Sequence, residues 1–113
     1  MSRDWRLRLD DIRDCCRKIL RYTSQVSKED FLADAMLYDA VVRNLEIIGE
    51  AAKHVPVHVR ESMASIEWKR IAGMRDWTAH GYFKLDSAIL WNVIEAKIPA
   101  LLAELEKSAG PPQ

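Results

Sequence analysis

The sequence predicts an all-α bundle formed by a single domain, and three observations carry this prediction. Apolar residues recur at steps of three and four along most of the chain, which is the pattern of helices with one buried face. No segment of useful length alternates apolar and polar residues with the period of two that a half-buried strand requires. The 113 residues are 49% hydrophobic and 30% charged, as is typical of one soluble globular domain.

The first helix is expected to run from about Asp4 to Thr23. Its buried stripe consists of apolar residues spaced three and four apart, namely Trp5, Leu9, Ile12, Cys16, Ile19 and Leu20. Cys15 and Cys16 are adjacent, so they cannot join distant segments through a disulfide, and two thiols alone form no metal site. We therefore interpret both cysteines as helix packing residues.

A long second helix is expected from about Lys28 to Lys53. Ser27 precedes it, and Asp30 follows three residues later, which is a variant of the capping box that begins many helices. The helix carries two apolar stripes, one of Phe31, Ala35, Tyr38, Val42, Leu45, Ile48 and Ala52, the other of Leu37, Ala40, Val41, Ile47 and Ala51. One bundle core needs a single stripe. This helix therefore either contacts a second subunit as well as its own core, or is a central helix buried on most sides within one chain.

Pro56 is expected to end the long helix. Residues 54–65 then form a connection with one short helical turn. A third helix is expected from about Glu67 to His80. Gly81 follows it, in a position that favours a left-handed C-cap.

The last helix is expected to begin after Asp86, a good N-cap residue. Pro99 lies inside its apolar pattern and should kink the helix or divide it in two, because proline lacks a backbone N–H and its ring collides with the preceding turn. We expect one domain over residues 1–107 and a flexible C-terminal tail over residues 108–113.

The formal net charge is zero, but the charges are unevenly distributed. Residues 1–21 and residues 53–75 each carry a net charge of +3, whereas residues 22–52 carry −4. The two basic stretches could form one basic surface after folding, and ordinary solvated helix faces explain the same numbers. The charged N-terminus does not have the pattern of a signal peptide, and no apolar run reaches the roughly 18 residues that span a bilayer. A cytoplasmic protein with no membrane segment is therefore expected.

The densest group of polar and aromatic residues is Arg75-Asp76-Trp77-Thr78-Ala79-His80-Gly81-Tyr82. Asp76 and His80 are four residues apart, so they lie on nearly the same face of a helix. Arg75 and His80 are separated by about 140° around an ideal helix. One ligand can reach both side chains only if the helix unwinds near His80, or if a second copy of the group lies across an interface.

These residue types suit the cleavage of a phosphodiester. Arg75 offers a fixed fork of donors to a phosphate, and His80 can exchange a proton near neutral pH. Asp76 could hold the imidazole in one tautomer and favour its protonated form. In RNA the adjacent 2′-hydroxyl is a built-in nucleophile, so a phosphate clamp and an acid–base group could cleave it without a metal ion. The same three residues at a helix end also fit an ordinary cap with surface ion pairs.

Arg75-x4-His80-x-Tyr82 resembles the Arg-x4-His-x-Tyr motif of the HepT-like toxins, which belong to the HEPN superfamily of helical ribonucleases. Asp76 fits the polar residue that often follows the arginine in that superfamily. The likeness extends to other segments in the expected order, which are residues 43–51, residues 68–75, and Trp91 with residues 98–101. Together these segments cover roughly residues 4–105.

The resemblance implies a HEPN-type antiparallel bundle of four to five helices that forms a homodimer, with both motifs at a cleft between the subunits. It implies a metal-independent endoribonuclease that cleaves RNA, either tRNA or mRNA, without a cofactor, and that is the toxin of a toxin–antitoxin pair. The partner would be an MntA-like nucleotidyltransferase antitoxin, which neutralises the toxin by AMPylation of the motif tyrosine. Arg75 and His80 would be catalytic, Asp76 would support them, and Tyr82 would be the modified residue.

A second hypothesis is a non-catalytic HEPN-like dimer that serves as a binding or scaffold subunit for the nucleotidyltransferase. The intact Arg75, His80 and Tyr82 favour the enzyme, since a scaffold would not need them. The net charge of zero favours the scaffold.

Three further sets of residues need an interpretation. His54 and His58 have the spacing of a zinc-binding helix, but Pro56 between them argues against a regular helix and so against a metal site. The polar residues of the long helix are either interface or groove residues or part of an exposed face; they are Arg43, Asn44, Glu46 and Glu50. Three tryptophans could stack RNA bases, but their helical spacing favours a place in the core; they are Trp68, Trp77 and Trp91.

Overall fold

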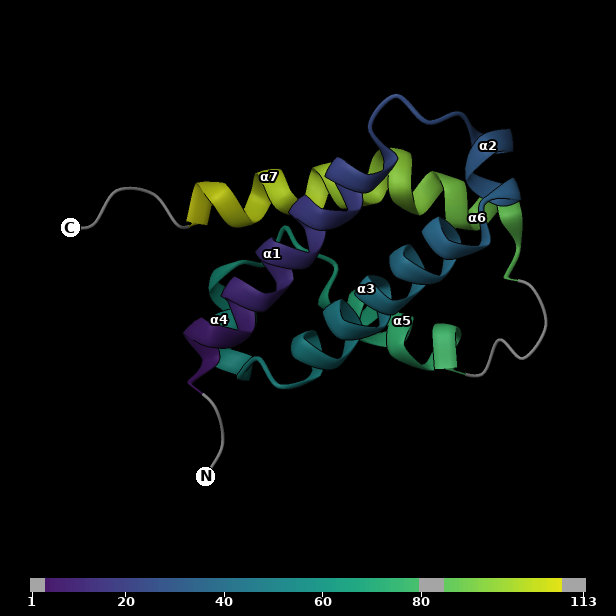
Figure 1. The fold of residues 1–113 in the computed structure, drawn as a ribbon. Helices are drawn as coiled ribbons and strands as arrows, with labels where there is room; N and C mark the ends of the chain where they lie inside the picture. Colours follow the sequence, from purple (N-terminus) through teal and green to yellow (C-terminus); the bar gives the residue numbers. More distant parts are fainter. Residues whose placement is uncertain (1–3, 80–84, 109–113) are drawn as a thin grey trace.

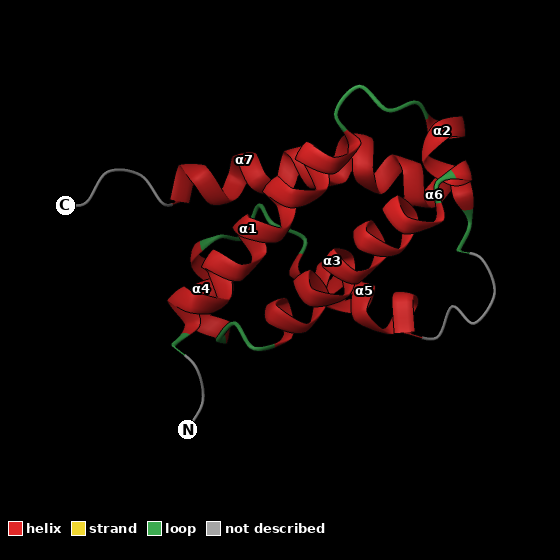
Figure 2. Cartoon of the chain, in the orientation of Figure 1, coloured by secondary structure: helices red, strands yellow, loops and turns green. Residues whose placement is uncertain are grey.

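Helices make up almost all of the structure. The computed structural model describes residues 4–79 and 85–108, and no strand occurs among them. In chain order the elements are α1 (Trp5–Thr23), α2 (Lys28–Ala33), α3 (Ala35–Lys53), α4 (Val57–Ser62), α5 (Trp68–Ala79), α6 (Ser87–Asn92), a π-helical segment η1 (Val93–Lys97) and α7 (Ile98–Ser108). Figure 2 shows these helices with the short loops that join them. The predicted all-α class is confirmed.

The long helices pack around one core with α3 at its centre. Figure 1 shows α1 and α3 running antiparallel, while α6, η1 and α7 form one rod along the upper edge. Helix α3 packs on α1 and on α5, and α1 also packs on α7. This arrangement is compatible with a HEPN-type antiparallel bundle. None of the described helices is long and apolar enough to cross a membrane.

The face of α1 that the spacing predicts is buried. Its core members are Leu9, Ile12, Cys15, Cys16 and Ile19, and Trp5 and Leu20 pack against them while partly exposed. Asp4 caps the helix by accepting a hydrogen bond from the Arg6 N–H at 2.8 Å. Cys15 and Cys16 are free and buried, as expected of packing residues. Burial raises the pKa of the Cys16 thiol to about 12, so this thiol stays protonated and inert at neutral pH.

The single long helix expected over residues 28–53 is wrong in one respect, because the helix is interrupted at Asp34. The backbone there is extended, with φ −103° and ψ 96°, and α2 ends at the residue before it. The Asp34 carboxylate accepts a hydrogen bond from the Leu37 N–H at 3.0 Å and so caps the start of α3. Aspartate favours such caps over helix interiors. The apolar spacing continues across the interruption from Phe31 to Ala35, so the sequence pattern gave no sign of it.

Two predicted N-caps are confirmed. The Ser27 hydroxyl oxygen accepts a hydrogen bond from the Asp30 N–H at 3.0 Å at the start of α2. The Asp86 carboxylate accepts one from the Ile89 N–H at 3.0 Å at the start of α6. Each bond satisfies a backbone donor that the first turn of a helix leaves without an internal partner.

Both stripes of α3 are largely covered within the chain, since the helix lies between α1 and α5. Val41 and Ala51 of the second stripe are buried, and Leu37 and Ile47 pack against the core while partly exposed. The structure therefore favours a central helix within one chain. The second stripe alone gives no separate reason to invoke another subunit.

The last helix is divided ahead of Pro99 as predicted, by a widened turn rather than a sharp break. The Ile98 N–H donates to the Val93 carbonyl, five residues earlier, which is the π-helical bond. This wider turn makes room for the proline ring, which would otherwise meet the carbonyl of the preceding turn. Ser108, placed in the predicted tail, is the last residue of α7. Residues 109–113 lie outside the described part of the chain, so the tail itself stays a prediction.

The connection between α3 and α5 contains the short helix α4, which begins directly after Pro56. Helix α5 begins at Trp68, one residue later than expected. Its predicted end at His80 and the predicted C-cap at Gly81 lie outside the described residues.

The core interpretation of the three tryptophans is confirmed. Trp68 is buried, and its indole N–H donates to the Met63 carbonyl at 3.1 Å. Trp77 and Trp91 are partly buried and pack against the core. The ring centroids of Trp91 and Phe31 lie 5.7 Å apart, a distance within the range of favourable aromatic pairs.

Candidate active site

Arg75 and Asp76 are the two predicted site residues that the structure describes. Both belong to the second half of α5. The predicted His80 and Tyr82 lie outside the described residues. The pairing of His80 with Asp76, and the angle between Arg75 and His80, therefore stay predictions.

Gly49 fixes the distance between α3 and α5 at the site. This glycine is buried in α3, opposite the backbone of Arg75. A Cβ atom added at Gly49 would lie 2.5 Å from the Arg75 backbone nitrogen and 3.1 Å from the Arg75 Cα and Cβ atoms. Only a residue without a side chain permits so close an approach. The contact therefore fixes the position of the Arg75 backbone relative to α3.

The guanidinium group of Arg75 is held at one position and accessible elsewhere. Its Nε forms an ion pair with a carboxylate oxygen of Glu50 on α3. Its terminal Nη1 lies 3.9 Å from a carboxylate oxygen of Asp76, a longer and weaker contact. The Arg75 side chain is 42% exposed. Because arginine carries five N–H donors, the terminal nitrogens remain available to a phosphate.

Glu50 connects Arg75 to a third side chain. Its second carboxylate oxygen, Oε1, lies 3.2 Å from Nε2 of His54, one turn farther along α3. The hydrogen bond from His54 is the largest influence on the Glu50 carboxyl and lowers its pKa. Desolvation opposes it and raises the pKa, and the nearby Arg75, His54 and Lys53 lower it again, so the net shift is downward. Glu50 is therefore ionised at neutral pH and offers one oxygen to each neighbour.

Glu50 is a site residue that the sequence left between two interpretations. Its spacing to His54 indicates a local pair, but nothing in the sequence indicates Arg75 as a partner. The other three polar residues singled out on this helix have partners of their own. Arg43 and Glu46 form an exposed ion pair at 2.7 Å. Asn44 is buried, and its side-chain amide donates to the Ala40 carbonyl at 2.8 Å.

The two histidines with zinc-like spacing have separate neighbours. His54 caps the end of α3 beside Glu50. The ring of His58 in α4 meets the ring of Trp5 edge-on, with centroids 6.4 Å apart. Within residues 4–79 and 85–108, no group of three or more histidine, cysteine, aspartate or glutamate residues could hold a metal ion.

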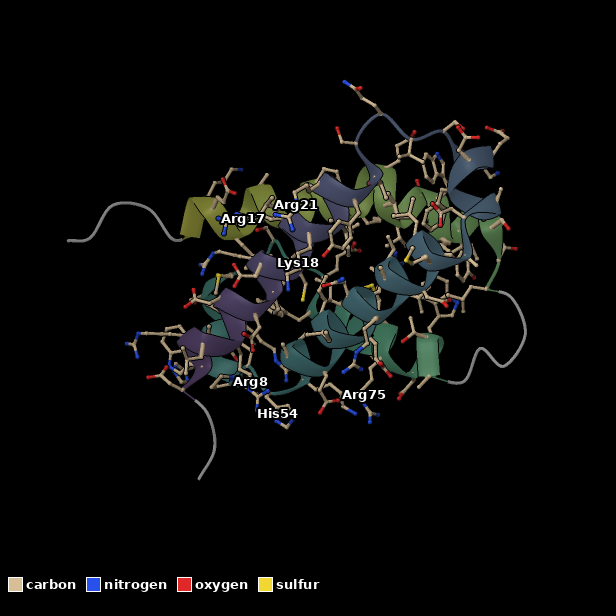
Figure 3. All side chains as sticks on the ribbon, in the orientation of Figure 1. Arg8, Arg17, Lys18, Arg21, His54 and Arg75 are labelled. Carbon is tan, nitrogen blue, oxygen red and sulfur yellow. The ribbon has the colours of Figure 1, made fainter. Side chains whose placement is uncertain are left out.

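The joining of the two basic stretches into one surface stays a prediction. Figure 3 shows Arg8 of α1 on the same lower edge as His54 and Arg75, while Arg17, Lys18 and Arg21 lie farther along α1. The carboxylates of Glu50 and Asp76 lie beside Arg75, so the charge there is mixed. Recognition of a phosphate at this edge would therefore depend on the donors of Arg75 more than on a broad positive field.

A groove of about 630 Å³ lies between α5 and the rod of α6, η1 and α7. Its apolar walls include Ile71, Met74 and Trp77 on α5 and Val93 and Leu101 opposite. Arg75 and Asp76 do not line it. The groove is thus a feature separate from the polar cluster around Arg75.

Comparison with known proteins adds a family to this geometry. A family model described as "Ribonuclease HepT-like" matches residues 12–108. A protein of Thermococcus cleftensis named "Probable ribonuclease HepT" is 38% identical over 107 residues, which cover 95% of this chain and 97% of that protein. A protein of Caldanaerobacter subterraneus subsp. tengcongensis, named as a "Putative RNase", is 43% identical over 99 residues, 88% of this chain and 85% of its own length.

A third relative carries additional sequence. It is a Methanocaldococcus jannaschii protein named "Gamma-glutamylcyclotransferase and putative RNase", which is 38% identical over 107 residues. The match covers 95% of this chain but 48% of that protein. No solved structure gives a significant match.

Proposed function

The chain belongs to the HepT-like ribonuclease family, and we propose that it is a metal-independent endoribonuclease and the toxin of a toxin–antitoxin pair. The family supports ribonuclease activity in general. The observation that carries the finer proposal is the accessible guanidinium group of Arg75, which is 42% exposed and anchored to α3 through its Nε. His80 follows five residues later in the motif.

In the proposed reaction the RNA supplies its own nucleophile. The 2′-oxygen attacks the phosphorus as its proton passes to a base, the bond from phosphorus to the 5′-oxygen breaks, and that oxygen takes up a proton. The products are a 2′,3′-cyclic phosphate and a 5′-hydroxyl. Arg75 stabilises the negative charge that grows on the phosphate oxygens, and His80 transfers protons.

A homodimer would solve the geometric difficulty of the motif. On an ideal helix Arg75 and His80 are about 140° apart, so a single chain does not direct both at one phosphate while the helix stays regular. A symmetric pair of chains would bring two Arg75–His80 sets around one cleft. We propose this composite cleft, on an RNA substrate such as tRNA or mRNA, as the working form of the protein.

Cleavage should require the ribose 2′-hydroxyl and no divalent metal ion. The test incubates the purified protein with a single-stranded RNA oligonucleotide and with its 2′-deoxy analogue, each in the presence of a chelator. We expect cleavage of the RNA alone, unaffected by the chelator, with cyclic phosphate ends in the product. Cleavage of both strands, or loss of activity with chelator, would contradict the mechanism. Cleavage of neither would favour the alternative of a non-catalytic subunit for the nucleotidyltransferase.

Tyr82 is the proposed site of AMPylation by an MntA-like nucleotidyltransferase. Its phenolic oxygen would attack the α-phosphorus of ATP and release pyrophosphate. The added AMP would place negative charge beside the cleft and repel an RNA phosphate. Mass spectrometry of the protein co-expressed with its partner should show AMP on Tyr82 and none on the control residues Tyr22 and Tyr38. An unmodified Tyr82 in a neutralised complex would instead indicate inhibition by binding.

A further inference from the structure

The Glu50 carboxylate contacts Arg75, the arginine of the motif, at one specific donor atom. Glu50 directly follows Gly49, and the close approach of α3 and α5 at Gly49 brings the Arg75 side chain within reach of it. The ion pair uses the Nε–H of Arg75. That donor lies at the stem of the guanidinium group, so its use orients the group. The two terminal nitrogens lie at the far end, where, among the described residues, Nη1 has only the longer 3.9 Å contact with Asp76.

From this geometry we propose that Glu50 is the positioning residue of the site. This inference rests on the ribonuclease function proposed above. It holds the Arg75 guanidinium group through Nε so that the two terminal nitrogens face the phosphate that is cleaved. A free arginine side chain samples many rotamers, and fixing it before substrate arrives removes that cost from the catalytic step.

His54 completes the arrangement by fixing Glu50 in turn. Its Nε2 lies 3.2 Å from Oε1 of Glu50, whereas Arg75 contacts the other oxygen, Oε2. With one partner at each oxygen, the carboxylate plane is set by two elements, the end of α3 and the middle of α5. Glu50 is therefore oriented as well as charged.

An ordinary surface ion pair is the competing interpretation. Both side chains are about two-fifths exposed, 42% for Arg75 and 43% for Glu50, and exposed pairs contribute little to stability. A pair that serves only as surface charge would leave the cleavage rate unchanged when removed. A pair that orients a catalytic group would lower that rate while the fold stays intact.

The Glu50→Ala variant is expected to lower kcat for RNA cleavage by about 10- to 100-fold, as is typical when a catalytic group loses its orientation. KM should change little, because removal of a carboxylate beside the phosphate site does not weaken phosphate binding. Glu50→Gln keeps an oxygen that accepts the Arg75 Nε–H bond and should recover most of the rate. In an Arg75→Ala background, Glu50→Ala should cause no further loss.

Glu46→Ala is the matched control. Glu46 lies one turn earlier on α3 and pairs with Arg43, so its removal changes the net charge equally without touching Arg75. We expect its kcat to equal that of the unchanged protein. An equal loss in Glu46→Ala and Glu50→Ala, or a further loss in the Arg75→Ala background, would overturn the positioning role.

A measurement without substrate separates this inference from the proposed function. Nuclear magnetic resonance should show a slowly exchanging Arg75 Nε–H signal, assigned by its absence in Arg75→Lys, that is lost in Glu50→Ala and kept in Glu46→Ala. An active protein in which Glu50→Ala keeps both this signal and full activity overturns the inference alone. A protein that keeps the protected signal but cleaves no RNA overturns the proposed function instead.

Discussion

Replacement of His80 with alanine should leave the fold intact and abolish RNA cleavage. His80 is the one residue of the motif that can exchange a proton near neutral pH, and loss of such a group lowers rates by about 10²- to 10⁴-fold. We expect cleavage to disappear while the melting temperature stays that of the unchanged protein.

His58→Ala is the control for this experiment. His58 is an exposed histidine in α4 that contacts Trp5, and it lies outside the motif. Rates of RNA cleavage in the presence of chelator, together with thermal melting followed by circular dichroism, should separate the two variants. Undiminished cleavage by purified His80→Ala would refute the assignment of this residue.

The helical class could be predicted from the sequence because α1, α3 and α7 each bury apolar residues at helical spacing. The break at Asp34 could not, since apolar residues on both sides keep the helical spacing and only the local capping bond selects the break. Pro99 predicted a division of the last helix correctly. The form of that division, a π-helical turn at η1, depends on how the neighbouring turns adjust.

The sequence predicted the parts of the candidate site that are neighbours along the chain, but not the contact between residues of different helices. Arg75 and Asp76 are adjacent in the motif, so the sequence alone brings them together. Glu50 comes from another helix, and its pairing with Arg75 depends on the close approach of two backbones at Gly49. No periodicity encodes that distance. His80, Tyr82 and the second subunit stay predictions of the motif and of its family.

Gly49→Ala should destabilise the protein although alanine is the better helix former. The added Cβ would lie 2.5 Å from the Arg75 backbone nitrogen, and a backbone atom cannot turn aside as a flexible side chain can. Helix α5 must therefore move away from α3, with a net loss of about 1–3 kcal/mol in the free energy of unfolding. The same movement separates Arg75 from Glu50 and should lower the rate of RNA cleavage.

Gly73→Ala, in α5, is expected to have the opposite effect on stability. Gly73 lies on the exposed side of α5, and nothing would lie within 4 Å of a Cβ added there. Replacement should therefore stabilise the helix by about 0.5–1 kcal/mol and leave cleavage unchanged. Denaturant unfolding of both variants measures the difference. If Gly49→Ala were stabilised as much as Gly73→Ala, α3 and α5 could not be in close contact at Gly49. The position of Arg75 would then not depend on that contact.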